Sequence, residues 1–311
     1  MKAIRMHTRG GPELLVYEEV PKPLPSDGDA LVRVDACAIT PTELSWSETY
    51  TTRDGAERLP TIPGYEVSGV VEALGDGVAT PGVGEAVFGL TDFNRDGAAA
   101  EYVLVHADDL APKPPSLSHV QAASVPLSAL TAWQALFDHA GLTQGQSVLI
   151  HAAAGGVGTY AVQLARWCGA RVIATAGAEN EGLVRELGAD EFIDYTAVPF
   201  ERQVRGVDVV LDTVGGETRE RSWGVVRRHG VLVTIVGAAS PQDAARHHVR
   251  GVDFIVKPIR SQLLEIANLV EAGKLRPIVG AVYPLEKAQE AFEDGLRGHG
   301  RGKRVLQVRA G

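Results

Sequence analysis

The second part of the chain alternates between short apolar runs and longer stretches in which apolar residues recur at helical spacing. Such runs are too short for helices, and without polar alternation they are typical of strands buried on both faces of a parallel sheet. We expect six of these strands after residue 118, at Ser147–Ile150, Arg171–Thr175, Glu191–Tyr195, Val207–Asp212, Val231–Val236 and Asp253–Val256. Strands that alternate with helices in this way predict a doubly wound parallel sheet and an α/β fold.

The first part of the chain, up to about residue 117, has short strands separated by frequent turns, as is typical of an antiparallel β domain. The strands are expected at Ala30–Ala36, Val67–Ala73, Gly82–Phe88 and Ala100–Val105. The segment Pro112–Pro115 marks the crossing into a second domain, because proline fits neither a helix interior nor a central strand. Near the end we expect a helix at Gln262–Ala272 and a closing strand at Arg304–Val308.

A turn made almost entirely of alanine and glycine joins the first of the six apolar strands to a helix. Its sequence, Gly156-Val157-Gly158-Thr159-Tyr160-Ala161, fits the pattern G-x-G-x-x-(G/A). Glycine is needed there because a Cβ atom would hold the backbone away from a pyrophosphate, whose charge is met by free N–H groups at the helix N-terminus. A second strand ends about 20 residues later, where a ribose-binding group is expected. The segment therefore predicts a dinucleotide site, with a glycine turn that only closes a βα unit as the alternative.

Composition limits the partners that the protein is expected to bind and the cellular compartment in which it is expected. The chain has 311 residues, enough for two domains, and a hydrophobic content of 45% that is ordinary for a globular protein. Its net charge of −9 argues against nucleic acid or an anionic membrane as the main partner, since both favour a basic face. We expect a cytoplasmic protein, because no apolar run has the length of a membrane helix and no leader opens the chain. Cys37 and Cys168 are expected to be reduced and to bind no metal.

Several motifs together resemble one family, the quinone oxidoreductase branch of the medium-chain dehydrogenase/reductase superfamily. The signature of that branch combines a double-glycine turn with a Gln five residues after its last Gly and a basic residue three further on. This chain has Gly155-Gly156-Val157-Gly158, Gln163 and Arg166, and further similar motifs at Leu130–Trp133, Asp212–Gly216, Gly273–Pro277 and Gly302–Leu306. The resemblance implies a GroES-like substrate-binding domain formed by residues 1–117 and 258–311. It also implies a Rossmann-type dinucleotide-binding domain at residues 118–257.

Residues at the zinc positions of related alcohol dehydrogenases differ in this chain. The resemblance places Thr40 where those relatives have a Cys ligand, and Tyr65 where they have a His ligand. Neither is a usual zinc ligand, since zinc prefers thiolate, imidazole or carboxylate groups. The interval from Gly84 to His106 contains no Cys, so the four-cysteine lobe that holds structural zinc in those relatives is missing as well. We therefore expect a protein that binds no metal.

The missing zinc ligands bear on the substrate, because an alkoxide is difficult to stabilise without a Lewis acid. Quinones and α,β-unsaturated carbonyls suit such a site, since the charge that arrives with a hydride moves onto an oxygen that needs only hydrogen-bond donors. The resemblance makes Thr40, Tyr50 and Tyr65 the candidate catalytic residues, each with a packing or surface role as its alternative. Zinc-free relatives usually have Asn-Pro-x-Asp where this chain has Thr40-Pro41-Thr42-Glu43. The final proton comes from a side chain or from water.

The end of the second apolar strand bears on the choice of cofactor. An acidic residue there would bind the ribose hydroxyls of NADH and repel the 2′-phosphate of NADPH, but this strand runs into Ala176-Gly177, so we expect NADPH. By resemblance, Tyr195 contacts the phosphate, and Arg297 or Arg301 reaches it from the C-terminal segment, with a solvated surface charge as the alternative for each Arg. The expected cofactor-binding residues are Thr131, Ala154, Gly155, Gly156, Val157, Gly158, Ala176, Gly177, Tyr195, Val214, Val236, Gly237 and Arg297.

These observations predict a zinc-independent, NADPH-dependent oxidoreductase that transfers a hydride to a quinone or an enone. The nearest enzymatic alternative is an enoyl reductase of a biosynthetic pathway, and an alternative of another class is a non-catalytic NADPH-binding protein. In relatives the last strand of the cofactor sheet pairs with its copy across a two-fold axis, and here the candidate is Val252–Val256. An apolar edge of this kind left unpaired is an aggregation hazard, so we expect a homodimer.

Overall fold

The computed structural model describes residues 1–298 and 300–309 of the chain, which forms two compact units. The first unit comprises Met1–Leu127, Pro258–Gly273 and Pro277–Gly311, and the second comprises Ser128–Lys257 and Lys274–Arg276. The first unit is therefore discontinuous in sequence. The predicted end of its domain, at residue 311, lies outside the described residues.

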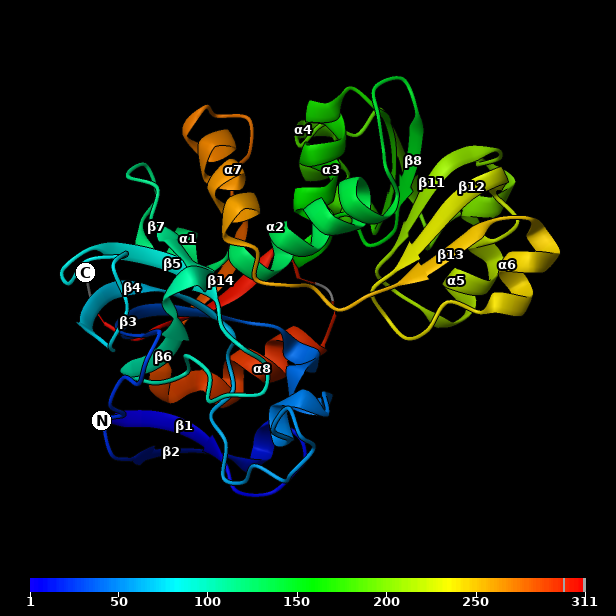
Figure 1. Cartoon of the computed structure of the whole chain (residues 1–311). Coiled ribbons are helices and arrows are strands. Elements are labelled where there is room, and N and C mark those ends of the chain that lie inside the picture. Colours follow the sequence, from blue (N-terminus) through cyan, green and yellow to red (C-terminus); the bar gives the residue numbers. More distant parts are fainter. Residues whose placement is uncertain (299, 310–311) are drawn as a thin grey trace. The chain divides into compact units, whose positions relative to one another are not determined.

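The second unit is built on a six-stranded parallel sheet with the strand order β10-β9-β8-β11-β12-β13. Its strands are β8 (Ser147–Ile150), β9 (Arg171–Ala176), β10 (Glu191–Asp194), β11 (Val207–Asp212), β12 (Val226–Thr234) and β13 (Arg250–Asp253), and its helices are α3 (Gly156–Cys168), α4 (Glu181–Glu186), α5 (Gly216–Ser222) and α6 (Pro241–His247). Helices α3 and α4 cover one face of the sheet, and α5 and α6 cover the other (Figure 1). The strand order reverses between β8 and β11, which confirms the predicted doubly wound sheet.

Burial explains why the apolar runs of this unit form its central strands. Val148, Leu149 and Ile150 of β8 are fully buried between the two helical layers. Leu149 lies opposite Ile173 on one side and Val210 on the other, so the register places apolar side chains beside one another across the sheet. Strands buried on both faces lose polar alternation, and this makes them recognisable in the sequence.

Two strands of this sheet begin earlier in the chain than we predicted. β12 starts at Val226 and ends at Thr234, whereas the apolar run predicted Val231–Val236. β13 spans Arg250–Asp253, whereas the predictions were Asp253–Val256 for the strand and Val252–Val256 for its edge. β13 has partners on one side only in the described chain, and an edge strand of this kind tolerates polar residues and glycine that a search for apolar runs passes over.

The apolar residues after β13 are used for contacts outside the sheet. The ring of Phe254 lies 4.3 Å from that of His139, centroid to centroid. The backbone N–H of Lys257 donates to Oε1 of Gln134 over 3.0 Å, and Gln134 begins a π-helix that extends to His139. Hydrophobicity alone therefore placed the strand wrongly, because Phe254 packs against a helix instead of joining a ladder.

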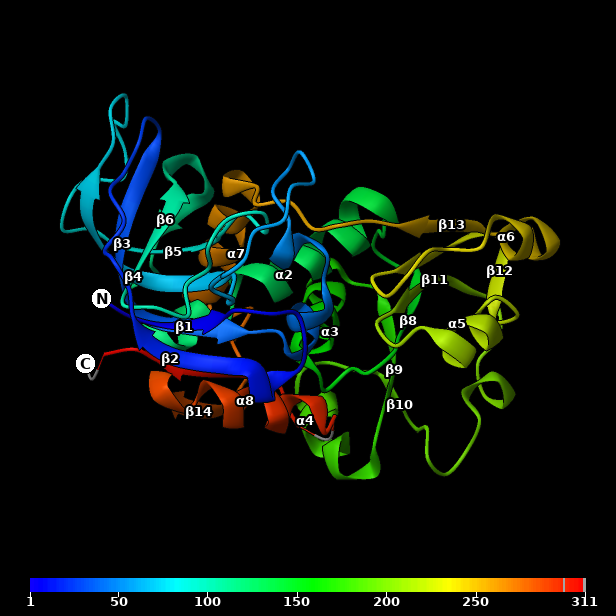
Figure 2. The same cartoon turned by 90° about the horizontal axis from the view of Figure 1, so that it is seen from below.

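The first unit contains a seven-stranded, largely antiparallel sheet with the order β14-β15-β3-β4-β5-β7, in which β6 also pairs with β3. The strands of the whole first unit, including two outside this sheet, are β1 (Lys2–Met6), β2 (Leu15–Glu19), β3 (Asp29–Ile39), β4 (Glu66–Leu74), β5 (Ala86–Leu90), β6 (Tyr102–His106), β7 (Leu110–Pro112), β14 (Val279–Pro284) and β15 (Lys303–Gln307). The helices are α1 (His119–Ala123), α2 (Pro126–Trp133), which runs on into the second unit, α7 (Arg260–Glu271) and α8 (Ala288–Leu296). Strands β1 and β2 form a separate antiparallel ribbon, seen side by side in Figure 2.

Helix α1 explains why the first segment of the first compact unit extends beyond residue 117, where the predicted domain boundary lies. Ala123 of this helix packs with Ala36 and Ala38 of β3, so the residues after 117 are bound to the β domain. The boundary between the units accordingly lies between Leu127 and Ser128. The segment Pro112–Pro115, which the sequence predicts as the crossing point, precedes this helix.

Two findings concern membranes and cysteines. None of the helices in the described part of the chain combines the length and the apolar character needed to cross a lipid bilayer. Cys37 and Cys168 are both free thiols, and Cys37 is fully buried in β3.

Candidate active site

The glycine turn of the second unit connects the carboxyl end of β8 to the N-terminus of α3. Ala152 within the turn has a φ of 48°, and its carbonyl faces the first turn of the helix. A Cβ atom on Gly158 would lie 2.3 Å from Ala152 O and 2.7 Å from Ala153 Cα, so only glycine permits this approach. Gly155, Gly156 and Val157 are partly exposed, and Ala154 is buried. The N-terminus of a thirteen-residue helix thus remains accessible, with the positive end of its dipole toward solvent.

Asp212 shapes the neighbouring turn at the carboxyl end of β11. The buried carboxylate accepts hydrogen bonds from the N–H groups of Val214 (3.0 Å) and Gly215 (2.9 Å) through Oδ1. The hydroxyl of Thr234, at the end of β12, donates to Oδ2 over 2.9 Å. These bonds order the edge where the strand order reverses, which is where open α/β sheets bind their ligands.

Three predicted cofactor residues line this same edge. Val214 and Val236 have exposed fractions of 47% and 42%, which is unusual for valines beside buried strands. Gly237 follows with a φ of 72°, and Nη1 of Arg219 donates to Val236 O over 2.7 Å. The edge therefore offers two apolar side chains on a backbone that Asp212 and Arg219 hold in place.

His151 directly follows β8 at the start of the glycine turn, and the sequence did not indicate its role. Its Nε2 lies 2.9 Å from Ser222 Oγ and its Nδ1 lies 3.0 Å from Thr175 Oγ1. Because the Ser222 hydroxyl donates to Thr218 O, we assign the ring proton to Nε2. Burial lowers the pKa of His151 to about 4, so the ring is neutral near pH 7. Through these two hydrogen bonds the neutral ring links the end of β8 to the ends of β9 and α5.

The predicted ribose residues are found together at the ends of β9 and β10. Ala176 is buried at the end of β9, and the N–H of Tyr195 donates to its carbonyl over 3.4 Å. Tyr195 itself has an exposed fraction of 56%. A carboxylate is also present, because a Cβ atom on Gly177 would lie 2.6 Å from Oε1 of Glu179. Asn180 donates to that same oxygen over 2.9 Å.

Two other predicted cofactor residues lie away from the turn in sequence. Thr131 is buried in α2 of the second unit. Arg297 follows α8 in the first unit and is exposed, and its N–H donates to Glu293 O over 3.3 Å.

Three strand ends converge in the first unit. Thr40 follows the last residue of β3, Glu66 begins β4 and Lys303 begins β15, and these strands are neighbours in the order β15-β3-β4. Because both neighbours run antiparallel to β3, their first residues lie beside its last one. Nζ of Lys303 donates to Thr40 Oγ1 over 3.0 Å and forms an ion pair with Glu66. The N–H of Leu127 donates to the other oxygen of Glu66 over 3.0 Å.

Glu43 adds a second buried carboxyl group to this cluster. It lies in a short 3-10 helix, Pro41–Ser45, that begins directly after Thr40. Its two oxygens accept hydrogen bonds from the N–H groups of Thr40 (3.1 Å) and Gly64 (2.8 Å). Burial raises the pKa of Glu43 to about 8, so this group is mainly protonated at neutral pH. Lys303 and Glu66 balance each other as an ion pair and a protonated Glu43 adds no charge, so the strand-end cluster of Thr40, Glu43, Glu66 and Lys303 carries no net charge.

The two candidate tyrosines are buried, and both hydroxyls have acceptors within the protein. Tyr65 donates to Thr49 Oγ1 over 2.9 Å, and Tyr50 donates to Leu44 O over 2.6 Å. Burial raises the pKa of both phenols. The ring of Tyr65 stacks on Trp46 at 6.1 Å and meets Phe93 edge-on at 5.0 Å. Of the three candidate catalytic residues, Thr40 is the one that is partly exposed.

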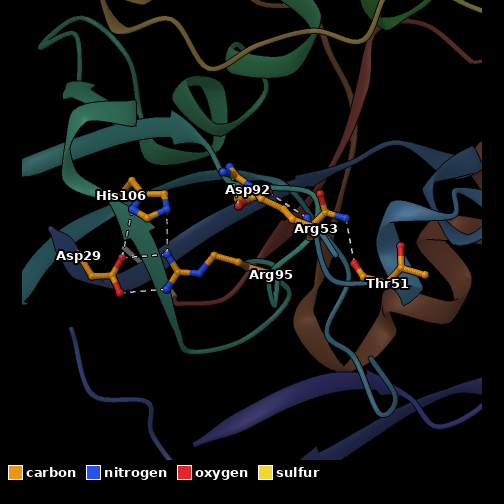
Figure 3. A network of polar contacts seen from close by, with 7 residues as sticks. Asp29, Thr51, Arg53, Asp92, Arg95 and His106 are labelled. Atoms are coloured by element: carbon orange, nitrogen blue, oxygen red, sulfur yellow. Dashed lines mark hydrogen bonds and ion pairs between the residues drawn. The ribbon is translucent and has the colours of Figure 1, made fainter. Parts of the chain in front are cut away.

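Phe93 belongs to a loop after β5 that polar contacts hold in place (Figure 3). The contacts join Arg95 to both oxygens of buried Asp29 (2.8 and 2.9 Å), His106 to Asp29 (3.4 Å), Arg53 to Asp92 (3.0 Å) and Asn94 to the carbonyl of Thr51 (2.9 Å). The loop lies in the interval where zinc-binding relatives are expected to have their four-cysteine lobe. Ion pairs to Asp29 of β3 and to Arg53 therefore order this segment, which carries an aromatic ring to Tyr65.

Sequence reasoning missed Glu43, Glu66 and Lys303 as members of one site. Lys303 lay in the motif Gly302–Leu306, which we used only as a sign of resemblance. A charged residue at the start of a strand normally indicates a solvated end, and its 263-residue separation from Thr40 gives no local signal. A Thr-Pro-x-Glu segment was the one local sign, because it is typical of a helix start whose Glu folds back on the first residue.

Comparison with known proteins gives two family matches. The family described as alcohol dehydrogenase GroES-like domain matches residues 26–115, and the family described as zinc-binding dehydrogenase matches residues 187–306. A probable zinc-binding oxidoreductase, mitochondrial, from Arthroderma benhamiae is 38% identical over an alignment of 313 positions, which covers 94% of this chain and 93% of that protein.

Solved structures are similar over the full length as well. The quinone oxidoreductase from Coxiella burnetii is 33% identical, with a TM-score of 0.93 and coverage of 99% of both chains. The mycobacterial protein Rv1454c in complex with NADPH is 29% identical, with a TM-score of 0.89 and coverage of 99% of this chain and 100% of that one.

The donor groups of this chain do not fit the zinc that one of these family descriptions names. Thr40 and Tyr65 offer hydroxyls, and the Tyr65 hydroxyl donates to Thr49. Cys37 is fully buried, and its thiol donates to Ala38 O over 3.5 Å. Within residues 1–298 and 300–309, no three His, Cys, Asp or Glu side chains are grouped as a metal ion would require. The absence of metal stays a prediction.

Proposed function

Because the chain belongs to the medium-chain dehydrogenase/reductase superfamily and is quinone oxidoreductase-like, we propose that it is a zinc-independent, NADPH-dependent oxidoreductase that transfers a hydride to a quinone or an α,β-unsaturated carbonyl. The family itself makes it an NAD(P)H-dependent oxidoreductase. The strand-end cluster supports the acceptor class, since it offers hydroxyl, ammonium and carboxyl groups in place of thiolates and imidazoles. Such groups suit an acceptor that spreads the arriving charge onto its own oxygen.

The cofactor site is proposed on the carboxyl edge of the second unit, where bound NADPH would supply the hydride. The turn residues Ala154–Gly158 would hold the pyrophosphate through backbone N–H groups at the start of α3. Val214, Val236 and Gly237 would border the nicotinamide, and Thr131 would lie near its ribose. The half-exposed valines support this role, because a flat ring covers apolar surface that water otherwise meets.

NADPH is proposed over NADH because the strand end at Ala176 carries no carboxylate. Tyr195, next to Ala176 and Gly177, offers a ring and a hydroxyl at the adenine ribose, and Arg297 is proposed to supply positive charge for the 2′-phosphate. The mycobacterial relative binds NADPH, which agrees with this choice. Glu179 argues against NADPH, because its carboxylate lies beside Gly177 at the same strand end.

The substrate is proposed to bind in the first unit, with Thr40 as its contact. Catalytic roles for Tyr50 and Tyr65 stay proposals. Both hydroxyls donate hydrogen bonds inside the protein, so these residues are better suited to shaping the substrate site than to donating a proton. The cytoplasmic location also stays a prediction, because the fungal relative is named mitochondrial.

A homodimer is proposed through the free edge of β13. The segment after it, Phe254–Val256, leaves Ile255 with an exposed fraction of 63%, so an antiparallel copy would cover this side chain and the unpaired backbone groups. Light scattering at micromolar concentration should give twice the chain mass. The mass of a single chain would contradict the dimer.

The function is tested by following the absorbance of NADPH with a set of acceptors. We expect oxidation with 9,10-phenanthrenequinone or 2-cyclohexenone, slower oxidation with NADH, and no loss after dialysis against a chelator. Faster turnover of a crotonyl thioester than of either acceptor would favour the enoyl reductase. Tight NADPH binding with no turnover of any acceptor would favour the non-catalytic binder.

A further inference from the structure

We infer that the buried ammonium of Lys303 polarises the hydroxyl of Thr40, so that Thr40 donates a strong hydrogen bond to the oxygen that becomes negative when the acceptor takes up a hydride. The inference deepens the proposed function and rests on it. Thr40 would be the catalytic residue, because it would touch the substrate. Lys303 would be a positioning residue that acts through Thr40.

The direction of the hydrogen bonds follows from the groups themselves. An ammonium has only hydrogens to offer, so in the 3.0 Å contact Lys303 must donate and Thr40 Oγ1 must accept. The hydroxyl hydrogen of Thr40 is then directed away from Lys303. A donor whose oxygen already accepts from a cation is a stronger donor, because the bonds of a chain polarise one another.

Burial decides where this donor acts. Lys303, Glu66 and Glu43 are buried, whereas Thr40 is partly exposed. The positive charge of Lys303 therefore acts on a ligand through the Thr40 hydroxyl, because the buried ammonium does not contact the ligand itself. In a poorly solvated site, fixed dipoles and charges stabilise a developing anion more than water would, because they need no reorganisation.

The two carboxyl groups set the charge that an anion would meet. Glu66 balances Lys303 and fixes its position, helped by the N–H of Leu127. An ionised Glu43 would make the cluster negative overall and would oppose an oxyanion at Thr40. Glu43 is instead mainly neutral at pH 7, because burial raises its pKa to about 8. The cluster thus presents a polarised donor without a net negative charge.

Besides the acceptor, the step needs NADPH as reductant and water as proton source. Bound NADPH would supply the hydride with its two electrons and would itself be oxidised. As the new C–H bond forms, a π-electron pair moves onto the carbonyl oxygen, which accepts the hydrogen bond from Thr40. The O–H bond of Thr40 does not break, and water supplies the proton that neutralises the oxyanion.

Turnover of Thr40→Val and Thr40→Ser is the first test, with a series of benzoquinones whose hydroquinones differ in acidity. Thr40→Val keeps the shape but removes the donor, and loss of one oxyanion donor costs about 100-fold in kcat. The loss should grow as the hydroquinone becomes a weaker acid, while the Kd for NADPH stays unchanged. Thr40→Ser should recover most of the rate. A Thr40→Val enzyme with unchanged kcat, or with the same loss for every quinone, would overturn the inference.

Lys303 needs variants that keep the charge balance, since Lys303→Met alone leaves Glu66 unpaired. The double variant Lys303→Met/Glu66→Gln should fold and should show the same dependence on quinone acidity as Thr40→Val. Lys303→Arg should keep most of the rate, because it keeps the cation. Lys287→Met, which removes an exposed lysine paired with Glu290, is the matched control. A fully active double variant would overturn the role of Lys303.

Binding of 4-nitrophenol separates this inference from the proposed function, because it needs no turnover. The absorbance of the phenolate reports its ionisation, and the bound phenol should become a stronger acid in the wild-type protein and in Thr40→Ser. Thr40→Val and Lys303→Met/Glu66→Gln should lose this shift. The inference fails if the bound phenol ionises alike in all four proteins or if the wild type binds none. A wild type that shows the shift but reduces no quinone or enone would contradict the function alone.

Discussion

The two candidate sites would stabilise negative charge by different means. In the second unit the groups that would meet a pyrophosphate are the backbone N–H groups at the start of α3, and His151 is neutral. In the first unit Lys303 and Glu66 form a buried ion pair, and a second carboxyl group, that of Glu43, is buried near them. Backbone dipoles do not titrate and need no partner. Buried ions do titrate, and each needs a partner of opposite charge. We therefore expect the glycine turn to be sensitive to volume and the strand-end cluster to be sensitive to charge.

The largest effect should come from leaving one ion of the cluster unpaired. Lys303→Met removes the cation from buried Glu66, and loss of one partner of a buried pair costs about 3–5 kcal/mol of folding free energy. Adding Glu66→Gln should recover most of it, since no charge is then left buried. Urea unfolding of both single variants and the double variant measures the coupling. Equal costs for Lys303→Met with and without Glu66→Gln would show that the pair is not coupled.

Opposite pH dependences should distinguish the two units. In the folded protein the pKa of Glu43 is raised from 4.5 to about 8, so its contribution to stability is present at low pH and is lost as pH rises from about 5 to 8. The pKa of His151 is lowered from 6.5 to about 4, so its contribution is present above pH 6.5 and is lost as pH falls toward 4. Each shift is worth a few kcal/mol, roughly.

The measurement is the unfolding free energy as a function of pH for the wild type and two variants. Glu43→Gln should flatten the curve between about pH 5 and 8, and His151→Gln should flatten it between about pH 4 and 6.5. If Glu43→Gln left the slope between pH 5 and 8 unchanged, Glu43 would be ionised in the folded protein. The strand-end cluster would then be negative, against the inference drawn above.

Added volume should affect the second unit instead. Gly158→Ala brings a methyl group within 2.3 Å of Ala152 O, so we expect a loss of about 1–3 kcal/mol in stability. NADPH affinity should fall about 10- to 100-fold, as the N–H donors move away from the pyrophosphate. Gly182→Ala is the matched control, because α4 has open space at that position and alanine favours helix. Fluorescence titration with NADPH should leave the control unchanged.

The smallest effect should be a change in cofactor preference. Glu179→Gln removes an exposed carboxylate beside Gly177, so NADPH affinity should rise a few-fold, as is usual for one exposed charge, and the gain should shrink in high salt. Ala176→Asp should act in the opposite direction by adding a carboxylate at the strand end. Competitive titration with NADPH and NADH measures both. A gain for NADH in Glu179→Gln would mean that the carboxylate does not face the 2′-phosphate.

The difference between the sites also explains what the sequence could predict. The glycine turn and the strands β8, β9 and β11 are local features, because the residues that form them are adjacent in the chain. The strand β13 was misplaced, since an edge strand needs little hydrophobicity and the apolar Phe254 packs on a helix instead.

The strand-end cluster was only partly predictable. Thr40 was identified because the resemblance placed it at a ligand position. Lys303 and Glu66 are brought to it by the register of β15 and β4 on β3, which no pattern of residues along the chain encodes. Nor does the sequence indicate that Glu43 is buried, since a glutamate near a helix start is normally solvated.

The order of the strands has a consequence for biosynthesis. β15 lies between β14 and β3 in the sheet, although β3 is made early in the chain and β15 late. A ribosome therefore completes the whole second unit before residue 303 emerges. The second unit can fold while translation continues, whereas residues 36–39 of β3 must wait for β15, because β6 pairs only with residues 29–33 on that edge. The ammonium that we place behind Thr40 arrives with that late strand, so an incompletely translated chain would acquire a nucleotide-binding unit before the first unit is complete.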